Sequence, residues 1–263
     1  HQFSTEQARQ PDNCGKCHLG PDHPQKEIYE ESKHGIAFKA YKDEMNLDSA
    51  KWVVGVDYTA APTCATCHMG ATRNQDSTHN VGERISWTNR PPVSVRPEVM
   101  DKKMGLASAE LKWDKRRENM QDVCSACHTE EYVNNFYIQY DSLIELYNNK
   151  YAIPGKELMA AAKPLLKPAK ISNKVEWTWF ELSHHEGRRA RMAASMMAPD
   201  YTHWHVTYDL AKHWYTKFVP QLEALIAKGN KAGGDKAKAA ANLQKKLDEV
   251  LSNEDHNWYL GKK

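Results

Sequence analysis

The sequence predicts an all-α protein, and three observations support this. Apolar and aromatic side chains recur at helical spacing through residues 136–151, and a second amphipathic pattern fills residues 235–251. No stretch alternates apolar and polar residues as a half-buried strand does. The second half is therefore expected to consist of long helices, and the first half of loops with one helix.

The first hundred residues are predicted to be mainly loops. Glu27 to Tyr41 is the one helix predicted there, and it carries His34. Residues 51–100 are rich in Pro, Gly, Thr and Asn, with no sustained 3.6-residue period and a Pro91-Pro92 break. These residues are expected to wrap around other groups as extended loops.

The helical half begins with an aromatic stripe. An electron path is one interpretation of the stripe, but core packing is favoured because the spacing is that of an ordinary amphipathic helix. Lys163 to Lys170 holds two prolines and is predicted to be a linker. The stripe consists of Phe136, Tyr140, Leu143, Tyr147 and Tyr151.

Three more helical segments follow the linker. Glu176 to Met197 is predicted to be a helix with one side formed by Phe180, His184, Arg188 and Arg191. Val206 to Lys228 is predicted to be a second helix, kinked or broken at Pro220, followed by a loop from Gly229 to Gly234. Asp235 is expected to cap the last helix, whose apolar residues are Leu243, Leu247, Val250 and Leu251.

The strongest chemical signal is a C-x-x-C-H motif that occurs three times. In this pattern two thiols form thioethers to a haem and the adjoining His ligates the iron. The three motifs use all six cysteines of the chain, so none is left over. The cysteine pairs are Cys14/Cys17, Cys64/Cys67 and Cys124/Cys127, and the proximal ligands are His18, His68 and His128. The sequence thus predicts a c-type cytochrome with three haems c.

Two other interpretations of the cysteine pairs are weaker. Structural zinc sites also use C-x-x-C, but a zinc ribbon usually brings its second pair within roughly 15–20 residues. The pairs here begin at residues 14, 64 and 124. A disulfide framework is the second alternative, and it does not explain a His after every pair.

The amino-acid composition is consistent with a haem protein and argues against two other classes, nucleic-acid-binding and membrane-spanning proteins. Mean hydropathy is −0.78 over 263 residues, and covalent haems would supply apolar bulk that so polar a chain lacks. A formal net charge of +2 without a basic run argues against nucleic-acid binding, and no stretch approaches 18 apolar residues, so no membrane span is expected. No signal peptide is visible at His1, and a mature, processed or truncated periplasmic (or equivalent extracytoplasmic) chain is expected.

Two regions are predicted: residues 1–135, which bind the haems, and residues 136–263, which serve oligomerisation and haem packing.

Histidines are in excess over the three motifs. Thirteen are present, of which ten lie outside the motifs, and a low-spin haem takes a second axial ligand that is most often His or Met. His23, His34 and His79 are predicted to be such ligands because they lie in the haem-bearing half. His256 is expected to be structural and His213 to pack or lie on the surface.

The arginines at 188, 189 and 191 either bind haem propionates or form a solvated basic face.

Several stretches together resemble the octahaem hydroxylamine oxidoreductase family. The resemblance is specific through residue 128, covers most of the chain and includes the last haem motif of the family at Cys124 to His128. It rests on Phe3-Ser4, the motif at Cys14, Asp22-His23, Ser32-Lys33-His34-Gly35, Ala61-Pro62-Thr63-Cys64, Cys67-His68-Met69 and Thr78-His79-Asn80.

The resemblance implies an enzyme with eight haems, of which this chain would form the C-terminal half. His1 occupies the place of a ligand to a haem whose motif lies further upstream, and the catalytic haem would lie outside these residues. Members form trimers in which a Tyr is linked to the catalytic haem of a neighbouring subunit, and Tyr201 is the candidate here. Its segment is shorter than in the Tyr-linked oxidative enzymes, and an ordinary packing Tyr is the other interpretation.

Three functions are compatible with these features. The first is a multihaem electron relay in an enzyme that oxidises hydroxylamine or hydrazine, with a small nitrogen compound and a redox partner cytochrome as partners. The second is a reductive homologue that acts on nitrite or hydroxylamine. The third is a non-catalytic trihaem electron carrier. A homotrimer, or a complex with further haem-bearing subunits, is the expected assembly.

Overall fold

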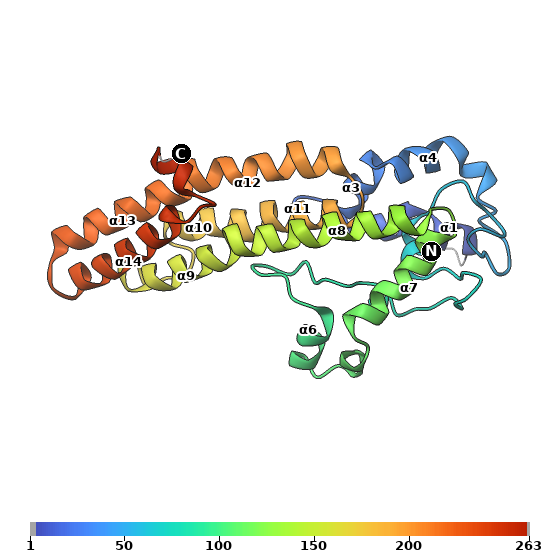
Figure 1. Ribbon diagram of the computed structural model, residues 1–263, viewed down its shortest axis with the longest axis horizontal. Coiled ribbons are helices and arrows are strands. Elements are labelled where there is room, and N and C mark those ends of the chain that lie inside the picture. The colour runs from blue at the N-terminus through green and yellow to red at the C-terminus, as the bar shows by residue number, and fades with distance from the viewer. Residues whose placement is uncertain (1–3, 262–263) are drawn as a thin grey trace. The chain divides into compact units, whose positions relative to one another are not determined.

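Helices dominate residues 4–261, which are the residues that the computed structural model describes (Figure 1). Within this range β-structure is limited to two isolated bridges, Val53 with Ala71 and Val54 with Tyr58. The predicted all-α class is confirmed. In the same range no helix has the length and apolarity that a bilayer crossing requires.

The chain divides into two compact units. Unit 1 comprises the residues up to 89 together with 94–142 and 192–201, and unit 2 comprises 90–93, 143–191 and the residues from 202 onward. The boundary predicted after residue 135 lies inside α8 (Glu130–Tyr147). This helix contributes residues to both units, as does α11 (Gly187–Ser195).

Unit 1 consists of short helices joined by long loops. Its 3₁₀ turns are Lys42–Glu44 and Ala107–Glu110. Its helices, besides the first part of α8, are α1 (Thr5–Arg9), α2 (Pro11–Gly15), α3 (Gln25–Glu31), α4 (Lys33–Tyr41), α5 (Cys64–His68), α6 (Pro97–Lys103) and α7 (Trp113–Ser125).

The single helix predicted over Glu27 to Tyr41 is wrong, because Ser32 splits it into α3 and α4. The backbone of Ser32 is extended, and its hydroxyl donates to the Tyr29 carbonyl (2.7 Å) and accepts from the Gly35 amide (3.1 Å). This is the N-cap arrangement, in which a serine side chain satisfies an orphan amide of the first turn. A Cβ at Gly35 would lie 1.9 Å from the Tyr29 carbonyl oxygen, so only glycine fits there.

The apolar core of unit 1 is small. It gathers side chains from α3, α4, α5, α7 and the loop between α4 and α5. The buried Trp52 indole donates to the Met45 carbonyl at 2.8 Å and stacks on Tyr58 with ring centroids 4.5 Å apart. The other buried members include Tyr29, Phe38, Leu47, Val54, Ala61, Ala65 and Val123.

Unit 2 is built from longer helical segments that contain π-helical turns. Figure 1 shows α13 (Val219–Ala232) and α14 (Gly234–Ser252) running antiparallel side by side, and α14 also packs on α9 (Ile153–Ala162). The other helices are α10 (Lys174–Phe180) and α12 (Tyr208–His213), and Lys163–Leu165 and Asn257–Leu260 are 3₁₀ turns. The π-helical turns are Asn148–Ala152, Glu181–Glu186, Trp214–Phe218 and Tyr201–Thr207, the last of which begins with a residue of unit 1.

Two of the predicted breaks in unit 2 are wrong. Pro220 does not interrupt its helix, because it lies in the first turn of α13 directly after a π-helical turn, where its missing N–H is tolerated. The predicted loop from Gly229 to Gly234 shrinks to a turn at Gly233, whose φ is 72°. Gly229 remains helical, and a Cβ there would lie 2.8 Å from the Ala240 Cβ, so its small size allows α13 and α14 to approach.

One continuous apolar core fills unit 2. Tyr147 and Tyr151 of the aromatic stripe belong to it, as core packing of the stripe requires. Leu243, Leu247 and Leu251 of α14 are buried on one face, with Val250 partly buried beside them. Other members include Leu158, Leu182, Leu210, Trp214, Phe218, Leu222 and Ile226.

Candidate haem-binding site

Each C-x-x-C-H motif occupies one helical turn of unit 1. In the first motif the amides of Cys17 and His18 both donate to the Cys14 carbonyl, at 3.1 and 3.0 Å. The third motif repeats these two bonds, at the same lengths, around the Cys124 carbonyl, and the second motif is α5 itself. Since residues three apart lie on the same face of a helical turn, the two thiols of each motif face the same side.

Folding brings the three motifs together, although they are far apart in the sequence. The thiols of Cys14 and Cys64 share a hydrogen bond, which raises the pKa of Cys64 and lowers the pKa of Cys14 to about 7. Burial, together with the nearby Cys124, raises the pKa of Cys67 to about 12. All six cysteines carry free thiols. The thiols that would each hold a cofactor therefore form one cluster.

A capping box fixes the start of α5. The Thr66 amide donates to the Thr63 hydroxyl (3.4 Å), and the Thr63 amide donates back to the Thr66 hydroxyl (3.0 Å). The buried Tyr58 hydroxyl also donates to the Thr66 hydroxyl, at 2.8 Å. This network orients the turn that carries Cys64 and Cys67.

Arg84 holds the other end of α5. Its side chain is only 2% exposed, and its guanidinium donates to the carbonyls of Thr66, Cys67 and Gly70 at 3.3, 3.2 and 2.8 Å. The Thr66 and Cys67 carbonyls are among those that the end of α5 leaves without intrahelical partners, and Gly70 lies just beyond this end. Sequence analysis missed Arg84, because an arginine within an aperiodic loop carries no signal of burial.

The orientation of His68 suits a metal ligand. Its Nδ1 lies 3.3 Å from the Val81 carbonyl, so Nδ1–H donates to this oxygen and Nε2 keeps its lone pair. Burial lowers the pKa of His68, which favours the neutral imidazole that binds metals. The loop around Val81 therefore orients the predicted proximal ligand.

His34 and His128 face each other at a spacing that suits two axial ligands. Their ring centroids are 6.1 Å apart, with an angle of 45° between the ring planes. With metal–nitrogen bonds of about 2.0–2.1 Å, two imidazoles on opposite sides of one metal ion place their centroids about 6 Å apart. Burial, and then the neighbouring His128, lower the pKa of His34. The sequence could not say which distal His faces which motif, and the structure places His34 beside the histidine of the third motif.

The remaining predicted distal ligands differ in their surroundings. His23 Nδ1 lies 2.8 Å from the Asp22 carboxylate. His79 is exposed in the loop after α5. His1 lies outside the described residues.

These features fit covalently attached haem c. Paired free thiols face one side of each helical turn, His68 is oriented through its Nδ1, and the His34 to His128 spacing matches a shared iron. A tetrahedral zinc site would need four ligands at each position.

A second polar network holds the loop between α5 and α7. Arg96 lies between two indole rings, 3.6 Å from the Trp87 centroid and 3.7 Å from that of Trp113. Arg117 binds the Asp141 carboxylate through two hydrogen bonds of 2.7 and 2.6 Å, and the Trp87 indole donates to the same carboxylate at 2.7 Å. Planar guanidinium groups are suited both to stacking and to forked binding.

Arg116, the residue before Arg117 on α7, forms a separate set of hydrogen bonds. It is 3% exposed and donates to the carbonyls of Gly82, Ser108 and Leu111 as well as to Asp101. Like Arg84, it gave no signal in the sequence.

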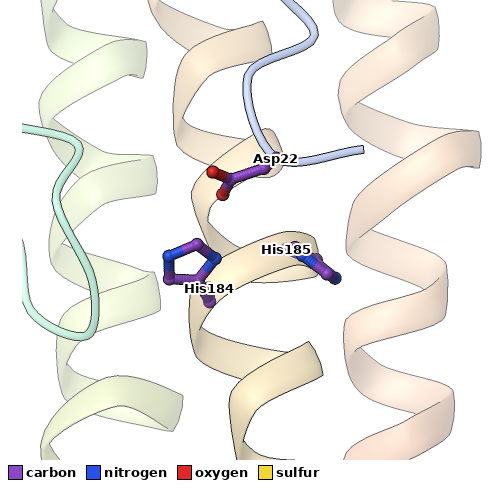
Figure 2. Close-up of side chains that lie close together, drawn as sticks. All are labelled: Asp22, His184 and His185. Atoms are coloured by element: carbon purple, nitrogen blue, oxygen red, sulfur yellow. The ribbon is translucent and has the colours of Figure 1, made fainter. Parts of the chain in front are cut away.

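Unit 2 carries a separate pair of histidines. His184 and His185 (Figure 2) both project from the π-helical turn Glu181–Glu186, with ring centroids 5.5 Å apart. His184 stacks on Phe180 at 4.5 Å, and His185 Nδ1 lies 2.8 Å from the Glu181 carboxylate. The third side chain drawn there, Asp22, belongs to unit 1.

The arginines and the tyrosine singled out in the second half are placed as follows. Arg191 is buried, donates from Nε to the Gly187 carbonyl (2.8 Å) and lies over the Tyr147 ring at 4.2 Å. Arg188 and Arg189 are partly buried. Tyr201 begins a π-helical turn and is 8% exposed, whereas Tyr208 is 56% exposed.

Comparison with known sequences identifies one family. Residues 1–152 match the family described as "Seven times multi-haem cytochrome CxxCH". A "Probable nitrite reductase-hydroxylamine oxidoreductase fusion protein" of Kuenenia stuttgartiensis is 34% identical over 149 residues, which cover 50% of this chain and 17% of that protein.

Two solved structures share the fold. A "Hypothetical multiheme protein" superposes with a TM-score of 0.72 at 24% identity. This match covers 89% of the present chain and 58% of the matched chain. A reducing HAO-like protein complex from Kuenenia stuttgartiensis superposes with a TM-score of 0.64 at 17% identity. This match covers 96% of the present chain and 59% of the matched chain. The chain thus spans only part of each of these proteins.

Proposed function

Because this chain belongs to the multihaem cytochromes with C-x-x-C-H motifs and is related to hydroxylamine oxidoreductase-like proteins, we propose that it relays electrons within such an enzyme acting on small nitrogen compounds. One observation carries the proposal: three haem-attachment motifs converge in unit 1, and the Cys14 and Cys64 thiols lie within hydrogen-bond contact. Electron tunnelling slows steeply with distance, so clustered attachment points support rapid transfer between the groups they hold.

The residues have distinct roles in this proposal. The cysteine pairs anchor three haems, each of which supplies reversible one-electron chemistry at iron. His18, His68 and His128 would each hold the iron of their own motif's haem, and His34 would hold the same iron as His128. His23, held by Asp22, and His79 would hold further irons, and His1 would hold the iron of a haem attached outside these residues. Two imidazole ligands keep the potential below that of a His/Met site.

Haem counting tests the proposal. Denaturing mass spectrometry of the native protein should show three covalent haems on this chain, at the three cysteine pairs, and electron paramagnetic resonance (EPR) should show low-spin ferric iron. Zinc by elemental analysis, with no haem absorbance after denaturation, would refute it. Eight covalent haems in the purified assembly would identify a complete enzyme. Three haems, all six-coordinate, in an assembly without further haem subunits would identify a trihaem carrier.

The direction of the chemistry depends on Tyr201. A tyrosine linked to the haem of a neighbouring subunit would favour oxidation of hydroxylamine or hydrazine. The burial of Tyr201 within its own chain supports the reductive alternative, because a phenol donated to a neighbour must be reachable. The name of one structural neighbour, a reducing HAO-like protein complex, is in keeping with that alternative, whereas the nitrite reductase-hydroxylamine oxidoreductase fusion carries both directions in its name.

A digest of the native assembly separates the two directions. A haem peptide cross-linked to the Tyr201 peptide would establish the oxidative enzyme. Subunits that separate on a denaturing gel, with no such peptide, would favour reduction of nitrite or hydroxylamine. We propose a periplasmic or equivalent extracytoplasmic location, a redox partner cytochrome, and a homotrimer or a complex with haem-bearing subunits.

A further inference from the structure

A tyrosine and a histidine form a buried hydrogen-bonded pair in unit 2, away from any haem motif in the sequence. The Tyr215 hydroxyl lies 2.9 Å from His256 Nδ1, and His256 Nε2 lies 2.9 Å from the Lys150 carbonyl. A carbonyl only accepts, so Nε2 carries the ring proton and Nδ1 accepts from the phenol. The direction of the tyrosine hydrogen bond follows from this tautomer.

The pair lies within an aromatic cluster. Trp214 stacks on His256 with centroids 5.7 Å apart, and Tyr151 meets the same imidazole edge-on at 6.2 Å. Trp258 contacts the Tyr215 ring edge-on at 4.6 Å and is 55% exposed, whereas His256 is 2% exposed. A contiguous set of oxidisable rings therefore leads from the core of unit 2 to its surface.

This geometry meets the requirement for reversible tyrosine oxidation. A phenol that loses one electron becomes a strong acid, so its proton must leave with the electron. In a buried site the proton must go to a neighbouring base, and a neutral imidazole nitrogen 2.9 Å away is such a base. Because the Lys150 carbonyl accepts from Nε2–H, it stabilises the imidazolium that forms.

We propose that Tyr215 and His256 form a proton-coupled redox site. A strong one-electron oxidant, of the class of high-valent metal complexes, takes one electron from Tyr215 and is reduced by one unit. The phenolic O–H bond breaks and an N–H bond forms at His256 Nδ1, which leaves a neutral tyrosyl radical beside an imidazolium. The reverse transfer restores both groups when an electron returns through Trp258.

The structural alternative is a hydrogen bond that only supports packing. Burial raises the pKa of Tyr215 to about 12, so the phenol is protonated at neutral pH in either case. The two accounts differ in what happens after an electron is removed, and the experiment must therefore start with oxidation.

The test uses the full haem-loaded chain with its irons ferric and photogenerated ruthenium(III) tris-bipyridine as the oxidant. The chain has 12 tyrosines, so the radical must be assigned by substitution. We expect a long-lived neutral tyrosyl EPR signal that Tyr215→Phe abolishes and that Tyr208→Phe, at an exposed tyrosine, leaves intact. His256→Phe should slow its formation by about 10²-fold, as expected for loss of a positioned base.

Two results would overturn the proposal. One is an equal long-lived signal in wild type and Tyr215→Phe. The other is an unchanged rate of formation in His256→Phe whose circular dichroism matches wild type. If His256→Phe does not fold, Tyr215→Phe decides alone, because it removes only a hydroxyl group.

Discussion

Units 1 and 2 stabilise their folds by different means. Unit 2 buries a continuous apolar core between long helices, whose backbone groups bond within the helix. Unit 1 has short helices and long loops, and buried arginines such as Arg84 and Arg116 bind carbonyls at the end of α5 and in the loops. Every buried carbonyl needs a donor, so a chain that wraps around cofactors must take donors from side chains. The difference predicts that the two units respond differently to the same kind of change.

The largest effect should come from removing a haem attachment. The double change Cys64→Ser with Cys67→Ser should remove one covalent haem and leave the centre of unit 1 without its largest apolar body. Amide hydrogen exchange should then rise throughout unit 1 and stay near wild type in α13 and α14. The matched control is Cys14→Ser with Cys17→Ser, which removes a different haem. An unchanged haem count in either variant would contradict the assignment of that pair.

The next effect is the loss of a buried guanidinium. Arg84→Met should destabilise unit 1 by about 4 kcal/mol, since each buried carbonyl left without a donor costs about 1–3 kcal/mol. Arg84→Lys should recover only part of this, because one ammonium cannot span three carbonyls held by a fork. Urea unfolding followed by haem absorbance measures the loss.

The control for Arg84 is an exposed arginine of the same unit. Arg73→Ala removes only a long, exposed hydrogen bond of 3.4 Å to Gly55 and should change stability by less than about 0.5 kcal/mol. If Arg73→Ala and Arg84→Met had equal effects, buried arginines would not be what holds unit 1.

An apolar truncation should act on unit 2 instead. Leu222 is fully buried in α13, and Leu222→Ala should cost about 3 kcal/mol through lost burial and a residual cavity. Hydrogen exchange should rise in α13 and α14, and the haem spectrum should not change. Lys228→Ala, at an exposed position of the same helix, is the control. A shift in the haem bands of Leu222→Ala would show that the units do not respond independently.

The smallest effect is a difference in pH dependence. Burial disfavours the Asp141 charge, but the hydrogen bonds from Arg117 and Trp87 outweigh it, so the pKa of Asp141 lies below its usual range. Its contribution to the stability of unit 1 is therefore present above the unfolded value of about 3.9 and is lost as pH falls through the folded pKa. Asp141→Asn should cost about 1–2 kcal/mol at neutral pH and give a flatter acid profile.

Glu186 of unit 2 should show the opposite sign. Burial raises the pKa of Glu186 despite its bond to His213. Its stabilising contribution is present below the unfolded value of about 4.3 and is lost as pH rises through the folded pKa. Glu186→Gln should therefore be most stable relative to wild type at neutral pH. The urea midpoints of Asp141→Asn and Glu186→Gln, measured between neutral pH and about pH 4, test both predictions. If the midpoints of the two variants changed with pH by the same amount relative to wild type, the predicted difference between Asp141 and Glu186 would be wrong.

Sequence patterns predicted the class and the family of this protein, and they were weakest where one residue changes the local geometry. The motifs are local in sequence, so spacing alone identified them. The break at Ser32 was missed because Glu27 to Tyr41 has helix-forming residues on both sides of a single capping serine. The sequence did not reveal the contacts of Arg84 and Arg116, because these side chains bind carbonyls that lie up to 18 and 34 residues away, respectively.

The π-helical turns limited the predictions in unit 2. Phe180, His184, Arg188 and Arg191 share a side at strict helical spacing, but the turn Glu181–Glu186 lies within this set and changes the register. Likewise, a proline inside a helix usually kinks or ends it, because proline lacks an N–H donor and its ring clashes with the preceding turn. Pro220 lies directly after a π-helical turn, in the first turn of α13, where neither effect interrupts the helix. The sequence also could not show that His34 lies beside His128, because this proximity depends on tertiary structure.

The π-helical turns also make unit 2 a natural subject for deletion scanning. A π-helical turn holds one residue more than an α-helical turn needs, so removing one residue from Trp214–Phe218 would leave an unbroken α-helix. Each residue of an α-helix advances the chain by about 100°, so everything after the deletion would rotate by that angle relative to what precedes it. Leu222 and Ile226 would then leave the core side of α13 while helix content stayed the same. In this unit, the extra residue in each turn determines which way the next segment faces.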